Sequence, residues 1–146
     1  AAVNVEIKIS KDITEPYAVI YTNAITEEVQ KIRSVLAFQS PVIPVSDDEK
    51  IVVLEPDEIF MIRTENTEVI VYGKDTRFRS EKRLYELEDL LGNGFLRISK
   101  STIVNLKKID YVEPSFNGMM AIRLKNGGKD YISRKYLPQL KNYLGI

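Results

Sequence analysis

The first forty residues carry two short apolar segments and one amphipathic stretch. Residues 3–9 alternate apolar and polar side chains, which is the period of a half-buried strand. After Pro16, the more apolar residues 17–21 predict a second strand. Thr26 can cap a helix with an acidic first turn and an apolar face. The pattern predicts an N-terminal β-β-α unit over residues 1–45, too small to be stable without packing on the remainder.

The second part, residues 46–146, has a mostly β pattern with short helices, so we predict an α+β fold. A polar turn at residues 65–67 joins two strands, and Asn126-Gly127 is a strong hairpin signal. The predicted strands are 51–54, 59–64, 68–72, 76–79, 95–98, 109–114, 119–124 and 129–132. Ahead of them, Pro41, Pro44 and the acidic residues 47–49 predict an exposed boundary turn.

Two amphipathic helices are predicted within this second part. Ser80 can cap a helix from Glu81 that Gly92 ends, and Ser133 can cap a last helix. The side chains expected to face inward from the last helix are Tyr136, Leu137, Leu140, Tyr143 and Leu144.

The composition excludes several kinds of chemistry. The chain of 146 residues has no cysteine and no histidine. It therefore has no disulfide, no thiolate or imidazole metal site and no histidine base. It also lacks a phosphate-binding glycine loop and a carboxylate pair in an apolar setting. We expect no enzymatic activity, no metal site and no cofactor.

Hydropathy and cysteine usage bear on location. With 44% hydrophobic and 29% charged residues, the chain is typical of a soluble globular protein. No apolar run approaches the roughly 18 residues that span a bilayer, and no secretory signal is visible. A chain without cysteine suits a reducing compartment, so we expect a cytoplasmic protein.

A neutral net charge conceals a strong asymmetry. Residues 1–60 carry five basic and eleven acidic side chains, a net charge of −6, and residues 61–146 carry sixteen and ten, a net of +6. From Phe95 onward ten basic side chains face three acidic ones, a net of +7. Such concentrated positive charge favours an anionic partner such as nucleic acid. The charge bias alone leaves a solvated, lysine-rich surface as an equal alternative.

The most informative segment is residues 95–109. It begins as an alternating strand and is interrupted by Ser99-Lys100-Ser101-Thr102 before apolar residues resume. A strand that ends in hydroxyls and an ammonium group can meet a polar, anionic partner.

Three segments resemble the LytTR family of bacterial DNA-binding domains, in the family's order. They are residues 57–72, residues 95–109 with Arg-x-Ser-Lys-Ser and Ile-Val-Asn-Leu, and residues 124–136. The resemblance covers about residues 51–146 and implies stacked β-sheets whose loops enter DNA grooves. The preceding residues leave no room for a receiver domain, so the chain is most similar to stand-alone LytTR regulators. These are often paired with a membrane-bound inhibitor protein, which the resemblance permits as a partner.

The resemblance implies two major-groove contacts. Lys100 matches a base-reading position, and Ser99 and Ser101 can donate to phosphates; many relatives have histidine in place of Ser99. Arg134 matches the second contact, since a guanidinium group suits the two acceptors of guanine. Lys135 is its expected phosphate neighbour.

The remaining groove contact of the family lies near Thr67. Here the adjacent Glu68 would repel phosphate unless it reads the amino group of cytosine or points away. Asn105 is expected to cap a turn. Candidates for contacts to the DNA backbone, each equally compatible with a plain surface role, are Arg97, Lys107, Lys108 and Asn117.

Together these features predict a sequence-specific regulator of transcription that binds double-stranded DNA at promoter repeats as a homodimer. An alternative is a protein-interaction or ligand-sensing module whose basic half docks an acidic partner.

Overall fold

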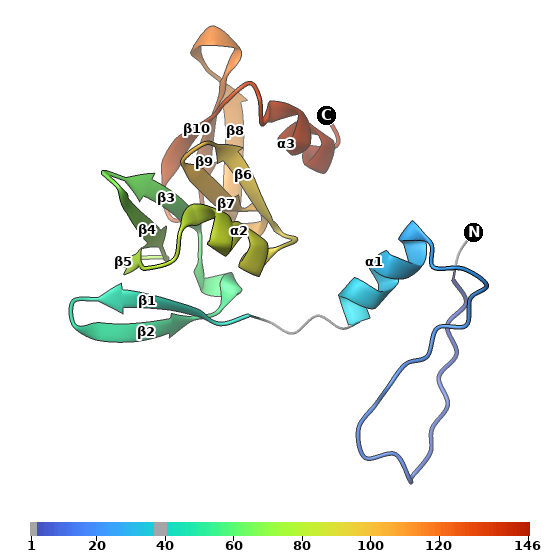
Figure 1. Ribbon diagram of the computed structural model, residues 1–146. Coiled ribbons are helices and arrows are strands. Elements are labelled where there is room, and N and C mark those ends of the chain that lie inside the picture. The colour runs from blue at the N-terminus through green and yellow to red at the C-terminus, as the bar shows by residue number, and fades with distance from the viewer. Residues whose placement is uncertain (1–2, 37–40) are drawn as a thin grey trace. The chain divides into compact units, whose positions relative to one another are not determined.

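The computed structural model describes residues 3–36 and 41–146 (Figure 1). The chain divides into two units, Ala1–Gln39 and Ser40–Ile146. The described strands of the second unit are β1 (Ile43–Asp47), β2 (Lys50–Leu54), β3 (Met61–Glu65), β4 (Glu68–Tyr72), β5 (Arg77–Ser80), β6 (Phe95–Ser99), β7 (Thr102–Asn105), β8 (Ile109–Pro114), β9 (Met120–Leu124) and β10 (Lys129–Ile132). Its α-helices are α2 (Leu84–Leu91) and α3 (Leu137–Leu144). The predicted domain boundary at residue 45 falls within β1 and stays a prediction.

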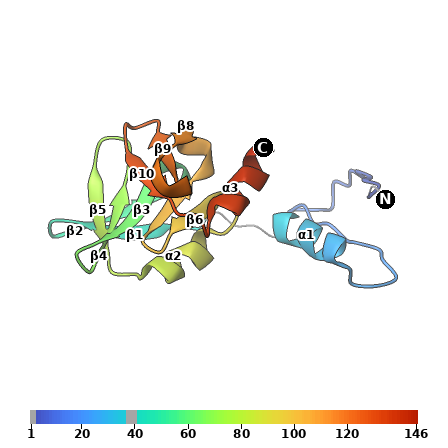
Figure 2. The ribbon, with the colours of Figure 1, turned by 90° about the horizontal axis from the view of Figure 1, so that it is seen from above.

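The second unit is built from two antiparallel sheets. The larger has seven strands in the order β2-β1-β5-β4-β3-β7-β6, and the smaller has three in the order β10-β9-β8. Figure 2 shows β8, β9 and β10 on one side of the larger sheet and α2 on the other. This arrangement, together with the short helices, confirms the predicted α+β class of stacked β-sheets.

Successive side chains of β3 belong alternately to two hydrophobic cores. Ile62 belongs to the core that includes Leu84, Leu87 and Leu91 of α2. The adjacent Met61 belongs to the other core, with residues of β9, β10 and α3. Because successive side chains of a strand point to opposite faces, one strand ties both layers together.

Strand β1 was missed by the sequence prediction, which treated this region as a boundary turn. Pro44 lies inside it, opposite Val53 of β2. Proline is tolerated because β1 pairs with its other neighbour, β5, only at Ser46, so no ladder hydrogen bond is needed from Pro44 on that side. The predicted turn itself is correct: Asp48 has a positive φ of 54° and joins β1 to β2.

Helix α2 begins three residues later than predicted. Ser80 belongs to β5, where it pairs with Val69, and so cannot serve as the residue before a helix. Its hydroxyl still accepts a hydrogen bond from the backbone N–H of Lys82, at 3.0 Å. The helix then runs from Leu84, and Gly92, with a φ of 61°, ends it as predicted.

Helix α3 buries less of its surface than the sequence predicted. Leu140 is fully buried and Tyr136 and Leu137 pack against the same core. Tyr143 and Leu144 are exposed, because the helix covers only one margin of that core with its first turns. No helix in the described residues is long and apolar enough to cross a membrane.

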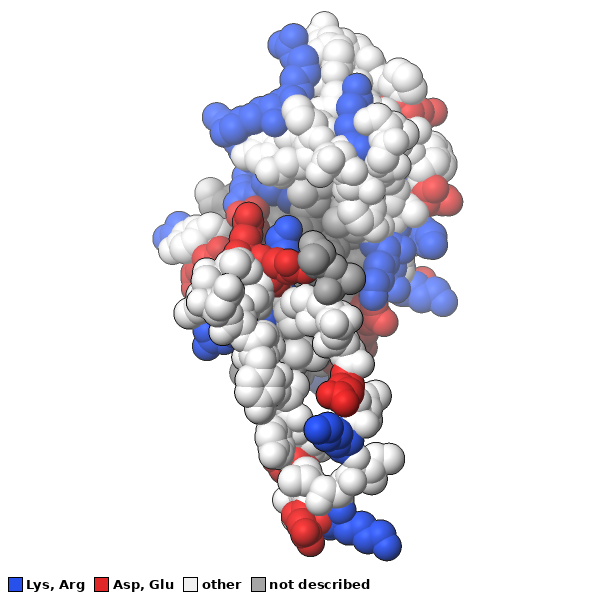
Figure 3. Space-filling view, turned by 90° about the vertical axis from the view of Figure 1, so that its right-hand side faces the viewer, with Lys and Arg blue, Asp and Glu red and all other residues white. Residues whose placement is uncertain are grey.

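The first unit differs most from its prediction. Helix α1 (Glu27–Leu36) is confirmed, and the Thr26 hydroxyl accepts a hydrogen bond from the N–H of Val29 at 3.2 Å. The strands predicted at residues 3–9 and 17–21 are absent. A strand exists only where a neighbour completes its backbone hydrogen bonds, and the described residues provide none. Figure 3 shows that the lowest part of this unit is mainly uncharged, with isolated acidic and basic side chains.

Candidate nucleic-acid interface

Two of the predicted contact turns lie side by side at one end of the larger sheet. Asn66 and Thr67 form the β3–β4 turn, with positive φ values of 48° and 71°. Residues 99–101 form the β6–β7 turn. The backbone N–H of Thr64 donates to the carbonyl of Ser101 at 2.8 Å, which joins the bases of the two turns.

A third turn reaches the same edge from the smaller sheet. After β10, the backbone N–H of Ser133 donates to the carbonyl of Ile98 at 2.9 Å. This hydrogen bond sets Arg134 and Lys135, both exposed, next to the end of β6. We call residues 66–67, 99–101 and 133–135 the three-turn surface.

The β6–β7 turn is held from within and leaves its cation outside. The Ser99 hydroxyl accepts the N–H of Ser101 at 3.2 Å, and the two hydroxyl oxygens lie 3.3 Å apart. The side chain of Lys100 is exposed and makes no ion pair within residues 41–146. The ammonium group is therefore available to a ligand.

Arg97 supports this turn from below. Its Nε lies 2.9 Å from a carboxylate oxygen of Glu88 in α2, and its Nη1 donates to the carbonyl of Lys100 at 2.7 Å. The guanidinium group, a candidate for a DNA-backbone contact, is thus engaged inside the domain.

Arg134 packs along a second loop at the same edge. Gly118 has a φ of 70°, and a Cβ added there would lie 3.2 Å from Cδ of Arg134. The neighbouring Asn117 is exposed, with a φ of 56°. Asn117 is therefore brought to the three-turn surface, as its candidate role requires.

Lys107 and Lys108 lie at the other end of the domain. They follow Asn105, which ends β7 away from the 99–101 turn. Asn105 caps them as predicted, since its side-chain oxygen accepts the N–H of Lys107 at 3.1 Å. The Nζ of Lys108 lies 4.9 Å from the centre of the Phe60 ring. The structure does not bring either lysine to the three-turn surface.

A polar joint between the sheets escaped the sequence prediction. Asp130 of β10 accepts a 2.8 Å hydrogen bond from the buried hydroxyl of Thr102 in β7. The same carboxylate lies 3.4 Å from the guanidinium group of Arg63 in β3. No local sequence pattern signals this joint, because its members come from three separated strands.

Arg63 also belongs to a cluster with Glu65 and Tyr72. The hydrogen bond from the Tyr72 hydroxyl lowers the pKa of Glu65, and Arg63 lowers it further. Burial, followed by the hydrogen bond to Glu65, raises the pKa of Tyr72. Burial alone would lower the pKa of Arg63, but hydrogen bonds and charge from Tyr72 and Glu65 outweigh it and raise that pKa. The cluster is thus ionised at Arg63 and Glu65 near neutral pH.

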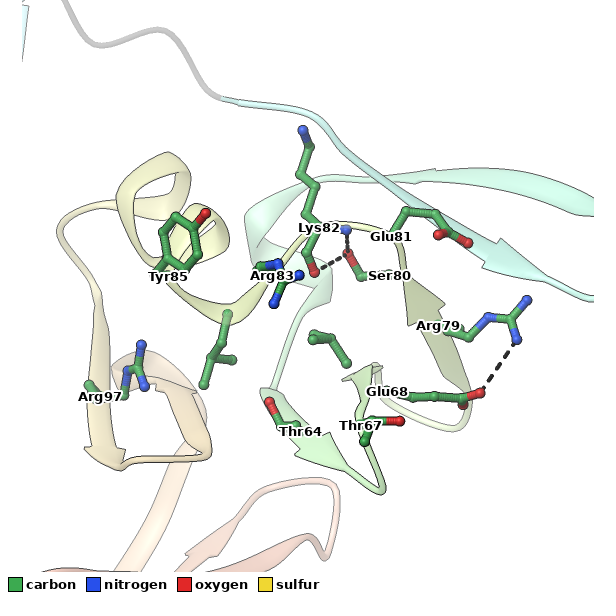
Figure 4. A pocket seen from close by; sticks show the side chains of 12 residues that line it. Thr64, Thr67, Glu68, Arg79, Ser80, Glu81, Lys82, Arg83, Tyr85 and Arg97 are labelled. Carbon is green, nitrogen blue, oxygen red and sulfur yellow. Dashed lines mark hydrogen bonds and ion pairs between the residues drawn. The ribbon is translucent and has the colours of Figure 1, made fainter.

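A hollow of about 700 Å³ adjoins the β3–β4 turn (Figure 4). Thr67 and Glu68 line one side, and Lys82, Arg83 and Arg97 line others. The sequence signal for this surface is the run of basic residues within 77–83, which was not predicted to contribute to the site. The hollow adds positive charge next to the three-turn surface.

Glu68 is not an isolated negative charge at this site. Its carboxylate lies 3.6 Å from the guanidinium group of Arg79, and Figure 4 shows this ion pair at the margin of the hollow. The nearby cation offsets the repulsion that Glu68 would exert on a phosphate.

The second unit is thus a β-rich domain whose turns present hydrogen-bond donors and cations on one edge. Such a surface is that of a nucleic-acid-binding domain. Among its described residues there is no helix-turn-helix, because five strands separate α2 from α3.

Comparison with known proteins identifies the family. The model of the LytTr DNA-binding domain matches residues 49–145. The chain therefore belongs to the LytTR family of DNA-binding domains, which confirms the resemblance inferred from its sequence. Because this is a family of DNA-binding regulators, the prediction that the chain is not an enzyme is also confirmed.

Individual relatives agree with this membership. An uncharacterised HTH-type transcriptional regulator of Staphylococcus aureus is 31% identical over 140 residues, which cover 94% of this chain and 95% of that protein. The sensory transduction protein LytT of Enterococcus faecalis is 27% identical over 109 residues, 74% of this chain and 45% of that protein. A solved LytTr DNA-binding domain from Bacillus cereus has a TM-score of 0.69 at 19% identity and covers 74% of this chain and 100% of its own.

Proposed function

We propose that this chain is a transcription regulator that recognises specific double-stranded DNA through its three-turn surface. The observation that carries the proposal is the meeting of the turns at residues 66–67, 99–101 and 133–135 on one edge. Their sequence separation is large, and backbone hydrogen bonds such as those from Thr64 to Ser101 and from Ser133 to Ile98 bring them together.

Each turn supplies a different kind of contact. Lys100 and Arg134 are the proposed base readers, since both can donate to O6 and N7 of guanine in the major groove. Ser99, Ser101 and Lys135 donate to phosphates, which fix the position of the protein on the duplex. Thr67 and Asn117 contribute at the margins of the same surface.

Further phosphate contacts come from the basic hollow. Lys82 and Arg83 line it and form no ion pair within residues 41–146. Arg97 acts as a positioning residue for the Lys100 turn rather than as a phosphate contact. Contacts to phosphates supply most of the affinity and make it dependent on salt.

The regulator acts, in this proposal, as a homodimer on two adjacent promoter repeats in the cytoplasm. The S. aureus relative bears the name of a transcriptional regulator and matches most of the chain, which supports a regulatory role. A membrane-bound inhibitor protein stays a prediction.

The test begins with in vitro selection of the DNA bound by the purified chain, followed by titrations at several salt concentrations. Arg134→Ala should weaken binding to the selected site by about 1–3 kcal/mol and relax one base preference. Lys100→Ala should likewise weaken binding to the selected site by about 1–3 kcal/mol and relax a second base preference.

Lys125→Ala is the matched control. It removes one exposed cation from the β9–β10 turn, whose backbone N–H contacts the carbonyl of Lys108 at the opposite end of the domain. Equal losses for the Lys125, Lys100 and Arg134 variants would refute the three-turn surface. No DNA binding even at low salt would favour the alternative of a module that docks an acidic partner.

A further inference from the structure

The first unit leaves its apolar side chains uncovered. Val5, Ile7 and Ile9 are 84%, 86% and 95% exposed, and Val35 of α1 is 71% exposed. None of the residues between 3 and 36 is fully buried. A unit of this size without disulfides is stable only when it associates with something else.

The backbone of its first segment is also unpaired. Within the described residues, no backbone hydrogen bond involves residues 3–9, and the nearest joins the N–H of Ile13 to the carbonyl of Ser10. An alternating segment with free N–H and C=O groups is a ready template for another strand.

We propose that residues 5–9 pair with the same residues of a second copy of this chain, as antiparallel strands centred on Ile7. In this register Glu6 of each copy lies opposite the partner's Lys8. Val5 lies opposite the partner's Ile9, so one face of the pair is wholly apolar and the other carries two opposite-charge pairs. The proposal rests on the homodimer of the proposed function and names the element that forms it.

Neighbouring registers are less favourable. Centring the pair on Glu6 or on Lys8 places two like charges directly opposite each other, which is destabilising. Centring it on Val5 leaves both charged residues without an ionic partner. Placing the two-fold axis between two residues, and not on one, sets apolar residues opposite polar ones, so the pair loses its apolar face.

The same self-complementarity favours a second copy over another occupant. A two-fold symmetric interface needs one patch that complements itself, and the order Glu-x-Lys about a central Ile7 meets that requirement. The apolar residues 17–21 and the apolar face of α1 are then available to cover the apolar face of the pair.

Cysteine cross-linking tests the register directly, because the chain has no native cysteine. In the full-length Ile7→Cys protein the two Cα atoms should lie about 4.5–5.5 Å apart, within the range of a disulfide. Lys11→Cys is the matched control, since its two copies should lie about 26 Å apart. Mild oxidation should link most of the Ile7 variant and little of the Lys11 variant.

Charge exchange tests the same register without a covalent bond. Glu6→Lys and Lys8→Glu should each raise the dimer dissociation constant about tenfold, as measured by sedimentation equilibrium without DNA. An equimolar mixture of the two variants should form heterodimers with near wild-type affinity, because each lysine then faces a glutamate. The Glu6→Lys/Lys8→Glu double variant should likewise recover.

The outcomes separate this proposal from the proposed function. Wild-type protein that stays monomeric at about 100 µM, or variants whose mixture is not rescued, would overturn the pairing. If residues 3–9 instead pair with a strand of their own chain, the Ile7→Cys protein should form no cross-linked dimer, and this result would also overturn the proposal. Binding of a single DNA repeat by the same variants reports on the three-turn surface alone and should match wild type.

Discussion

The joint between the two sheets should depend on the Asp130 carboxylate. One of its oxygens accepts the 2.8 Å hydrogen bond from Thr102 and lies 3.4 Å from the Arg63 guanidinium group. Thr102 has 0% of its surface exposed. Asp130→Ala therefore leaves a buried hydroxyl with no side-chain acceptor within the described residues.

The expected cost follows from these contacts. A hydrogen bond to a charged group contributes about 1.5–3 kcal/mol, and a buried donor left unpaired costs about 1–3 kcal/mol. The Arg63 ion pair is partly exposed and adds less than about 1 kcal/mol. We expect Asp130→Ala to lower the free energy of unfolding by about 2–3 kcal/mol and Tm by about 10 °C.

Urea unfolding followed by circular dichroism measures this loss, and a double-mutant cycle with Thr102→Val assigns it. With the hydroxyl already removed, Asp130→Ala should cost only about 1 kcal/mol, which gives a coupling energy of about 1–2 kcal/mol. Asp130→Asn keeps an acceptor oxygen and should fall between wild type and Asp130→Ala. Additive single effects, within about 0.5 kcal/mol, would refute the reasoning.

Two further predictions concern the carboxylates of Glu88 and Glu65. Glu88→Ala should weaken DNA binding about threefold in anisotropy titrations although it removes a negative charge, because Arg97 loses the partner that steadies it beneath the 99–101 turn. The hydrogen bond from Tyr72 lowers the pKa of Glu65 in the folded protein below its value in the unfolded chain. The Glu65 carboxylate therefore stabilises the fold at pH values above its unfolded-state pKa. This stabilisation is lost as the pH falls through the folded-state pKa of Glu65. Thermal melts from about pH 7 to pH 3 should show a smaller loss for Tyr72→Phe than for wild type.

Each of these has a contrary outcome. Asp110→Ala is the control for Glu88→Ala, because it also removes a carboxylate, but an exposed one at the start of β8. It should not weaken DNA binding. If Glu88→Ala binds DNA as tightly as Asp110→Ala does, Arg97 has no positioning role. A Tyr72→Phe protein that loses Tm with acid as steeply as wild type would show that the tyrosine does not control Glu65.

Short-range patterns determined much of the fold. The Asn126-Gly127 turn, the glycine that ends α2 and the Asn105 cap were all predicted, because each depends on contacts within a few residues. The predicted helix start after Ser80 was wrong because Ser80 pairs with Val69 of β4 and so belongs to a strand. The local sequence around Ser80 contains no information about this pairing with β4.

The candidate DNA-contact residues also show the difference between what local sequence predicts and what tertiary contacts decide. From the sequence alone, Arg97, Lys107 and Asn117 were equivalent polar residues in the basic half. Tertiary contacts separate them: Arg97 is paired with Glu88, Lys107 lies at the far end, and Asn117 stands beside Gly118 and Arg134.

By itself, the sequence determined the family, the order of most strands and the three polar turns, because these are properties of consecutive residues. Only the tertiary structure decided that the turns share one edge, since hydrogen bonds between residues about 35 positions apart join them, as from Thr64 to Ser101. It also decided that residues 3–9 are not a strand within this chain. Their alternation suits them to pairing, but pairing requires a neighbouring strand, and the described residues of the first unit contain none.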